Sequence, residues 1–174
     1  MIGLAPLVKD FIDNIGAASE LQSVVDIGTG ASARVYTERP SDDAALPFIA
    51  IDIVSANAWN DGSVRGTDYL VQVSLYVARG EQGASRGILD VAKAQEIIRD
   101  MLDDRDGYFL DESPAEGPAL DFDFADIRFQ RRSASGAKLV LRQYQAATIV
   151  PDQSGRYLAA TSRFRCLVGN AKGA

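Results

Sequence analysis

The residue types that most often perform acid–base and nucleophilic chemistry are scarce in this chain of 174 residues. It has no histidine, which removes the commonest general base and the commonest metal ligand. Its single cysteine, Cys166, excludes an internal disulfide and a multi-cysteine zinc site. Cys166 falls on the predicted inward face of the last strand, which indicates a small core residue rather than a reactive thiol. We therefore expect no catalytic residue, no metal site and no cofactor.

A glycine-rich segment is the strongest candidate for a cofactor loop. Residues 24–30, Val-Val-Asp-Ile-Gly-Thr-Gly, resemble the first loop of S-adenosylmethionine-dependent methyltransferases, and Asp52 ends an apolar strand as a ribose-binding acid would. In that family the loop opens a helix that crosses back over a parallel sheet. Here residues 33–47 hold two prolines and a Ser-Asp-Asp run, and the next strand returns through a hairpin. The sequence favours a flexible turn, and a methyltransferase-like enzyme is the alternative.

Charged residues are strongly separated along the second half of the chain. Residues 100–126 hold ten acids and one base, whereas residues 127–151 hold five bases and no acid. The acids can in principle bind Ca²⁺ or supply a carboxylate pair, but their spacing matches no calcium loop and favours a solvated face. The separation has two interpretations, which are pairing across a hairpin and a head-to-tail interface between copies. Head-to-tail contacts generate closed rings where the rotation closes.

The candidate interface residues follow from this charge map and from one tryptophan. Trp59 lies beside the Asn-Asp-Gly turn at residues 60–62, either as an interface anchor or as a lid over the sheet edge. The predicted interface comprises Trp59, Asp61, Arg65, Asp121, Asp123, Arg128, Arg131 and Arg132.

Length and composition predict one globular domain over residues 1–174, with 47% hydrophobic and 24% charged residues. The net charge of −6 does not favour sequence-specific binding of nucleic acid. No apolar run reaches the length of a membrane span, and the first residues lack the pattern of a signal peptide. We expect a soluble protein made in a reducing cytoplasm.

Hydrophobic periodicity predicts a helix over residues 4–15 and a second over residues 85–104. A strand over residues 48–54 and an alternating strand over residues 69–77 flank the turn, as in an antiparallel hairpin. Further strands are expected at residues 126–130, 138–149 and 157–168. The predicted fold is α+β, a twisted antiparallel sheet with two helices on one face and a β-hairpin arm.

This order of elements resembles the tail-terminator, or tail-completion, proteins of long-tailed bacteriophages and gene transfer particles. The resemblance is carried by Arg-Val-Tyr at residues 34–36 and Leu-Pro-Phe-Ile at 46–49, the strand over 68–77, the helix starting near residue 84, and the ending over 155–165. It covers most of residues 1–104 and 139–168. Residues 105–137 depart from the family pattern, as an inserted acidic loop and hairpin arm would.

The resemblance implies a structural virion protein without catalysis or cofactor. It implies a ring, usually hexameric, that caps the head-proximal end of the tail tube, stops tube polymerisation and offers a surface to the head. The implied partners are other copies of the chain, the tail tube protein and the head–tail connector, and DNA is expected to pass through the ring. The implied location is the virion tail, after assembly in the bacterial cytoplasm. A methyltransferase-like enzyme and a generic α+β adaptor that binds a peptide along a sheet edge remain the alternatives.

Overall fold

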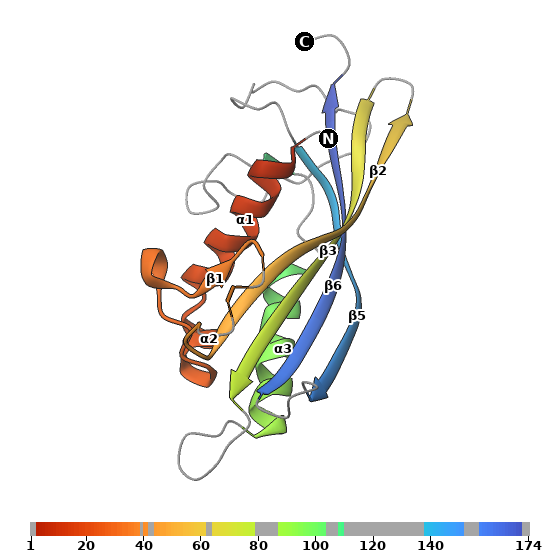
Figure 1. The fold of residues 1–174 in the computed structure, drawn as a ribbon. Helices are drawn as coiled ribbons and strands as arrows, with labels where there is room; N and C mark the ends of the chain where they lie inside the picture. Colours follow the sequence, from red (N-terminus) through yellow and green to blue (C-terminus); the bar gives the residue numbers. More distant parts are fainter. Residues whose placement is uncertain are drawn as a thin grey trace.

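The computed structural model describes residues 3–38, 40–41, 44–61, 64–78, 87–103, 108–109, 138–151 and 157–171. These residues form a strongly twisted sheet with helices packed against it (Figure 1). The predicted α+β class is confirmed. The predicted single domain over residues 1–174 stays a prediction. Of the predicted insertion at 105–137, the structure describes only a two-residue strand, and the hairpin arm lies outside the described residues.

The sheet has six strands in the order β1-β2-β3-β6-β5-β4. Its long strands are β2 (Phe48–Asp61), β3 (Val64–Ala78), β5 (Lys138–Pro151) and β6 (Tyr157–Ala171), and the short outer ones are β1 (Val35–Tyr36) and β4 (Tyr108–Phe109). Every neighbouring pair is antiparallel except β1 and β2, which are parallel. The prediction of a wholly antiparallel sheet is therefore wrong at β1. The connection over residues 37–47 returns the chain to the end of the sheet where β1 begins, so β2 runs alongside it.

The strands alternate as their sequences predict. β2 and β3 form a hairpin between Asp61 and Val64, at the predicted Asp-Gly turn. On β3 the inward residues are fully or almost fully buried: Tyr69, Val71, Val73, Leu75 and Val77. On β6 the predicted face is buried from residue 160 to residue 168: Ala160, Ser162, Phe164, Cys166 and Val168. This alternation gives the sheet one buried face and one open face.

Three α-helices lie within the described residues, where two were predicted. They are α1 (Leu4–Ala17), α2 (Ser19–Val24) and α3 (Ile88–Leu102). The additional helix arises because Ala18 is extended, with φ −74° and ψ 91°, which ends α1 and lets the chain turn into α2. None of the described helices is long and apolar enough to cross a membrane.

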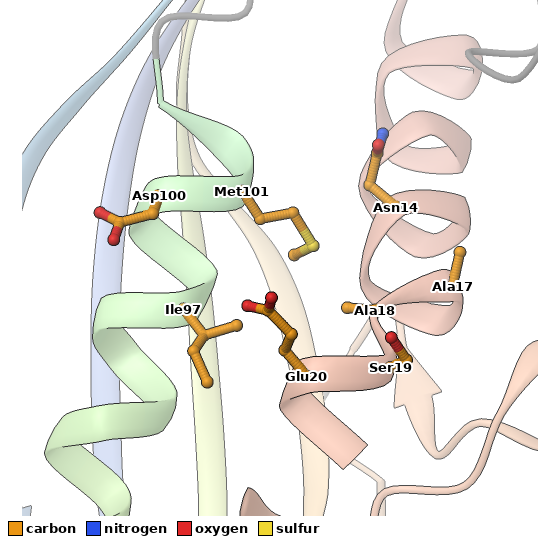
Figure 2. Close-up of a pocket in the computed structure, with 8 residues that line it drawn as sticks. All are labelled: Asn14, Ala17, Ala18, Ser19, Glu20, Ile97, Asp100 and Met101. Atoms are coloured by element: carbon orange, nitrogen blue, oxygen red, sulfur yellow. The ribbon is translucent and has the colours of Figure 1, made fainter. Parts of the chain in front are cut away.

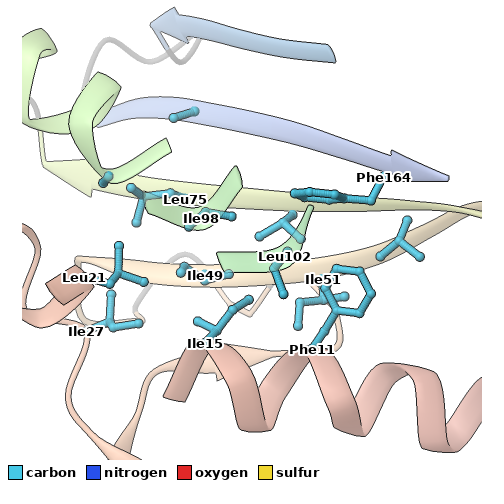
Figure 3. Close-up of a cluster of buried hydrophobic side chains, with 14 of the residues drawn as sticks. Phe11, Ile15, Leu21, Ile27, Ile49, Ile51, Leu75, Ile98, Leu102 and Phe164 are labelled. Carbon is cyan, nitrogen blue, oxygen red and sulfur yellow. The ribbon is translucent and has the colours of Figure 1, made fainter. Parts of the chain in front are cut away.

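The core lies between the helices and the buried face of the sheet (Figure 3). Phe11 and Ile15 point from α1 toward the sheet, and the ring of Phe11 meets the edge of Phe164 on β6 at 5.9 Å between centroids. A polar contact fixes α3: Nε2 of Gln95 donates to the backbone oxygens of Thr148 on β5 and Thr161 on β6, at 3.2 and 3.0 Å. The helix layer is therefore held by both packing and directed hydrogen bonds.

Candidate interaction surfaces

Three of the predicted interface residues lie at the far end of the β2–β3 hairpin. Trp59 on β2 is half-buried against Gly66, its cross-strand neighbour on β3. A Cβ added at Gly66 would come within 2.3 Å of the indole nitrogen of Trp59, so only glycine leaves room for this ring. Asp61 ends β2, and Arg65 is exposed on β3 opposite Asn60. Trp59 thus covers its own sheet, and the interface role of these three residues stays a prediction.

The other five predicted interface residues cannot be placed. They lie outside the described part of the chain: Asp121, Asp123, Arg128, Arg131 and Arg132. Arg142, the last of the five bases in residues 127–151, is described on β5 and is fully buried.

Arg142 forms a buried ion pair with Asp10 of α1. Its guanidinium carbon also lies 4.5 Å from the centroid of the Phe11 ring, in cation–π geometry. For Arg142, pairing within the chain is therefore what the structure shows, and this residue is not available to a neighbouring copy. The pair ties the first helix to the strand 132 residues later in the chain.

Cys166 lies opposite Arg142 on the neighbouring strand. Burial raises the pKa of its thiol from 9.0 to about 12, although the nearby Arg142 acts in the opposite direction. A thiol held neutral in this way is a poor nucleophile. The inward position predicted for Cys166 is confirmed.

The open face of the sheet carries a row of aromatic rings at one end. The row runs from Tyr36 on β1 through Phe48 on β2 and Tyr76 on β3 to Tyr157 on β6, with centroid separations of 5.8, 4.8 and 5.6 Å. Cross-strand aromatic pairs of this kind stabilise a sheet. The rings contact one another across four strands, so they stiffen this end of the open face.

Polar side chains occupy the middle of the same face. Nε of Arg163 donates to Oε1 of Gln72 at 3.2 Å, and Asp52 is the cross-strand neighbour of Gln72 on its other side. Partial burial raises the pKa of Asp52, and the nearby Glu38 raises it further. Farther along, Nε and Nη2 of Arg165 both donate hydrogen bonds to Oδ2 of Asp68, at 3.0 and 2.7 Å. These contacts form a polar surface without a nucleophile paired to a base.

The glycine-rich segment forms a turn rather than a cofactor loop that opens a helix. The backbone N–H of Gly28 donates to Oδ1 of Asp26 at 3.2 Å, and Gly28 and Gly30 take positive φ values of 81° and 53°. Only a three-residue 3₁₀ turn follows, at Gly30–Ser32, before the chain enters β1. The helix that a methyltransferase loop requires is absent from this described segment. Within the described residues, no group of three acidic or cysteine side chains is arranged to hold a metal ion.

A shallow groove of about 470 Å³ lies between the end of α1, α2 and α3. Figure 2 shows Glu20 directed from α2 toward Ile97 and Met101 of α3, with Asn14 on the opposite wall. The nearby carboxylate of Asp100 is already paired with Arg99. The groove offers small apolar contacts with an acidic rim and no obvious chemistry.

Two further features of the surface are apolar. A hollow of about 680 Å³ lies along the first part of α1, and its lining is mostly apolar apart from Lys9: Gly3, Leu4, Ala5, Pro6, Val8, Lys9 and Ile12. Four large apolar side chains are at least about half exposed within the described residues: Val54, Ile88, Leu89 and Val150. Val54 lies on β2 and Val150 on β5, at opposite sides of the sheet, and the other two begin α3.

The outer edges of β2 and β5, where Val54 and Val150 lie, were not identified from the sequence as candidate contact surfaces. A signal was present, because residues 53–60 and residues 143–151 form uncharged runs of eight and nine residues. The runs could not be assigned to the outside of the sheet without its strand order.

Comparison with known proteins shows a likeness in fold to a chain of a virion. No protein-family model matches the chain, and no curated protein matches its sequence. Among solved structures, it is similar to a chain in the "Virion of native gene transfer agent (GTA) particle". The TM-score is 0.63 at 13% sequence identity, and the match covers 94% of this chain and 95% of the other. The likeness therefore extends over nearly the whole of both chains and concerns their fold.

Proposed function

We propose that this chain is a structural protein of a phage-like particle, and that it acts as a tail terminator. In this role copies of the chain form a closed ring, six by expectation, on the head-proximal end of the tail tube. The ring stops tube polymerisation and provides the surface that joins tail to head. Its partners are further copies of itself, the tail tube protein and the head–tail connector, and DNA passes through the ring.

One observation carries this proposal. The fold matches that of a chain from a gene transfer agent virion over almost the full length of both. The order of elements also agrees with the tail-terminator pattern in the regions that the structure describes, from the first helix to the closing strand. The two features that could have supported an enzyme do not favour one: the thiol of Cys166 is buried, and only a three-residue 3₁₀ turn follows the glycine-rich segment.

The proposal is tested by the mass of the purified protein, measured by light scattering over a concentration series. Six copies of 18.7 kDa give about 112 kDa for a closed hexamer. Ring-shaped particles of uniform size in electron micrographs, each with a central opening, would agree with that mass. A protein that stays monomeric throughout, also in the presence of assembled tail tube, contradicts the proposal. Calorimetry with S-adenosylmethionine tests the enzyme alternative, for which we expect no heat of binding.

A further inference from the structure

Of the four long strands, β2 and β5 lie toward the two edges of the sheet, and most of their outer sides lack the usual protection against pairing with another chain. Within the described residues, β2 is paired on its outer side only at Ile49 and Ala50, by β1. β5 is paired on its outer side only at Lys138 and Leu139, by β4. Most of each strand therefore presents one row of backbone N–H and C=O groups without a partner strand in the described chain.

Natural proteins commonly place charges on such edges to prevent pairing with another chain. The inner strands carry exposed charges such as Arg65 on β3 and Arg163 and Arg165 on β6, whereas the charges of β2 and β5 stand outside the central free stretches: Asp52, Asp61, Lys138 and Arg142. The central free stretches of β2 and β5 lie within two uncharged runs, residues 53–60 and 143–151. Both edges thus lack the feature that would keep a second copy away.

Apolar exposure coincides with these same edges. Val54 is 48% exposed on β2, and Val150 is 50% exposed on β5. Ile88 and Leu89, the other exposed apolar residues, begin α3 at the end of the sheet where β5 ends (Figure 1). One side of the sheet therefore carries Val150 with Ile88 and Leu89, and the other carries Val54.

We infer that the outer edge of β5 in one copy pairs with the outer edge of β2 in the next copy, so that the sheet continues from copy to copy. This inference rests on the proposed ring and identifies the surfaces that close it. β2 and β5 run in opposite directions in the sheet, because each step from β2 to β3, β6 and β5 is antiparallel. Copies that follow one another in the same orientation therefore bring β5 and β2 together as an antiparallel pair. The contact is head-to-tail, which is the type that closes rings.

Side-chain faces restrict the register of the pair. Opposing the middle of the two uncharged runs places Ala56 opposite Ala147 and Asn57 opposite Ala146. Ala56 pairs with Tyr69, and Ala147 pairs with Ser162; both of these partners point into the core. Asn57 and Ala146 pair instead with Asp68 and Arg163 of the open face. Over residues 55–57 and 146–148 this register therefore keeps the helix-covered face and the open face continuous across the junction.

The contact has a natural limit at one end. The backbone N–H of Tyr144 donates to Oδ1 of Asp103, at the end of α3, at 2.7 Å. Because the N–H of Tyr144 already donates to Asp103, it is not available to a partner strand. Residues 146–150 are therefore the part of β5 left to receive one. Residues 146–148 oppose residues 55–57, and the bulge between Ile53 and Ser55 then brings Val54 beside Ile149.

Disulfide trapping tests this register. Side chains directly opposite in an antiparallel pair have Cβ atoms about 4.5–5.5 Å apart, close enough for a disulfide after a small adjustment. We mix the A56C and A147C variants under mild oxidation and expect cross-linking about tenfold faster than in either variant alone, because association raises the effective concentration. The native Cys166 is buried and does not contribute. The matched control mixes N57C with A147C, whose side chains point to opposite faces and should cross-link slowly.

The outcomes separate this inference from the proposed function. Edge pairing is supported if the mixture of A56C with A147C cross-links fast and the control mixture does not. The closed ring is supported if the A56C/A147C double variant forms a covalent ladder that stops at six copies. Oligomers of ring mass without this cross-link overturn edge pairing and leave the ring. Cross-linking of A56C with itself overturns the head-to-tail arrangement. Cross-linked chains of unlimited length support edge pairing but contradict the ring, and a monomer without cross-links overturns both.

Discussion

Two arginine–aspartate pairs in this protein have the same chemistry and opposite surroundings. Arg142 and Asp10 join β5 to α1 with side chains only 0% and 2% exposed. Arg165 and Asp68 join β6 to β3 on the open face, with side chains 47% and 24% exposed. In the first pair both charges have left water, and only the partner and nearby groups replace the lost hydration. In the second pair water solvates both charges whether or not they pair.

The difference indicates separate roles for the two faces of the sheet. The buried pair selects one position of α1 over the sheet, since any displacement would separate two desolvated charges. Losing the exposed pair costs little free energy of unfolding, so this pair does not fix the arrangement of side chains on the open face. The fixed face therefore sets the shape of the protein, and the proposed contacts with other chains are assigned to the open face and the edges.

The largest effect should follow from breaking the buried pair on one side. R142L leaves the carboxylate of Asp10 buried without its partner, and we expect a loss of about 3–5 kcal/mol in the free energy of unfolding. Urea unfolding followed by circular dichroism measures this loss. The double variant D10L/R142L removes both charges and should recover much of it. Equal destabilisation by the single and double variants would show that packing around Arg142, rather than its charge, matters.

How far the sequence predicts the structure can be judged from the same elements. The alternation from Tyr69 to Val77 and the Asp-Gly turn are local patterns, so they predicted the hairpin and its buried face correctly. The amphipathic stripe over residues 4–15 likewise predicted α1. The extended conformation at Ala18 and the parallel pairing of β1 depend on how the chain folds back, and no local pattern encodes them.

The candidate surfaces were harder to predict for a related reason. Arg142 belongs to a run of bases that suggested a charged surface, yet its partner lies 132 residues earlier on the first helix. Its burial follows from the strand order, which places β5 beneath α1. The uncharged runs on β2 and β5 are visible in the sequence, but an uncharged run becomes an open edge only once the neighbours of each strand are known.

An effect of intermediate size is expected from the thiol beside the buried pair. The pKa of Cys166 rises from 9.0 to about 12 on folding, so between these values the native state holds a proton that the unfolded state has lost. Its contribution to the free energy of unfolding is therefore complete below pH 9 and falls by about 1.4 kcal/mol per pH unit above it. Urea unfolding at pH 8 and pH 10 measures the fall. In C166A this part of the slope should be missing; an identical slope in both proteins would contradict the assigned burial.

The smallest effect should follow from breaking the exposed pair. R165Q removes the charge that holds Asp68 on the open face, and we expect a loss below about 1 kcal/mol in the free energy of unfolding. Because the pair is solvated, 1 M salt should reduce this difference further, whereas the loss in R142L should persist in salt. Parallel urea titrations of R165Q and R142L at low and high salt measure both. A loss in R165Q as large as that in R142L would mean that the open face is covered in the native protein, as it would be if neighbouring copies bury it.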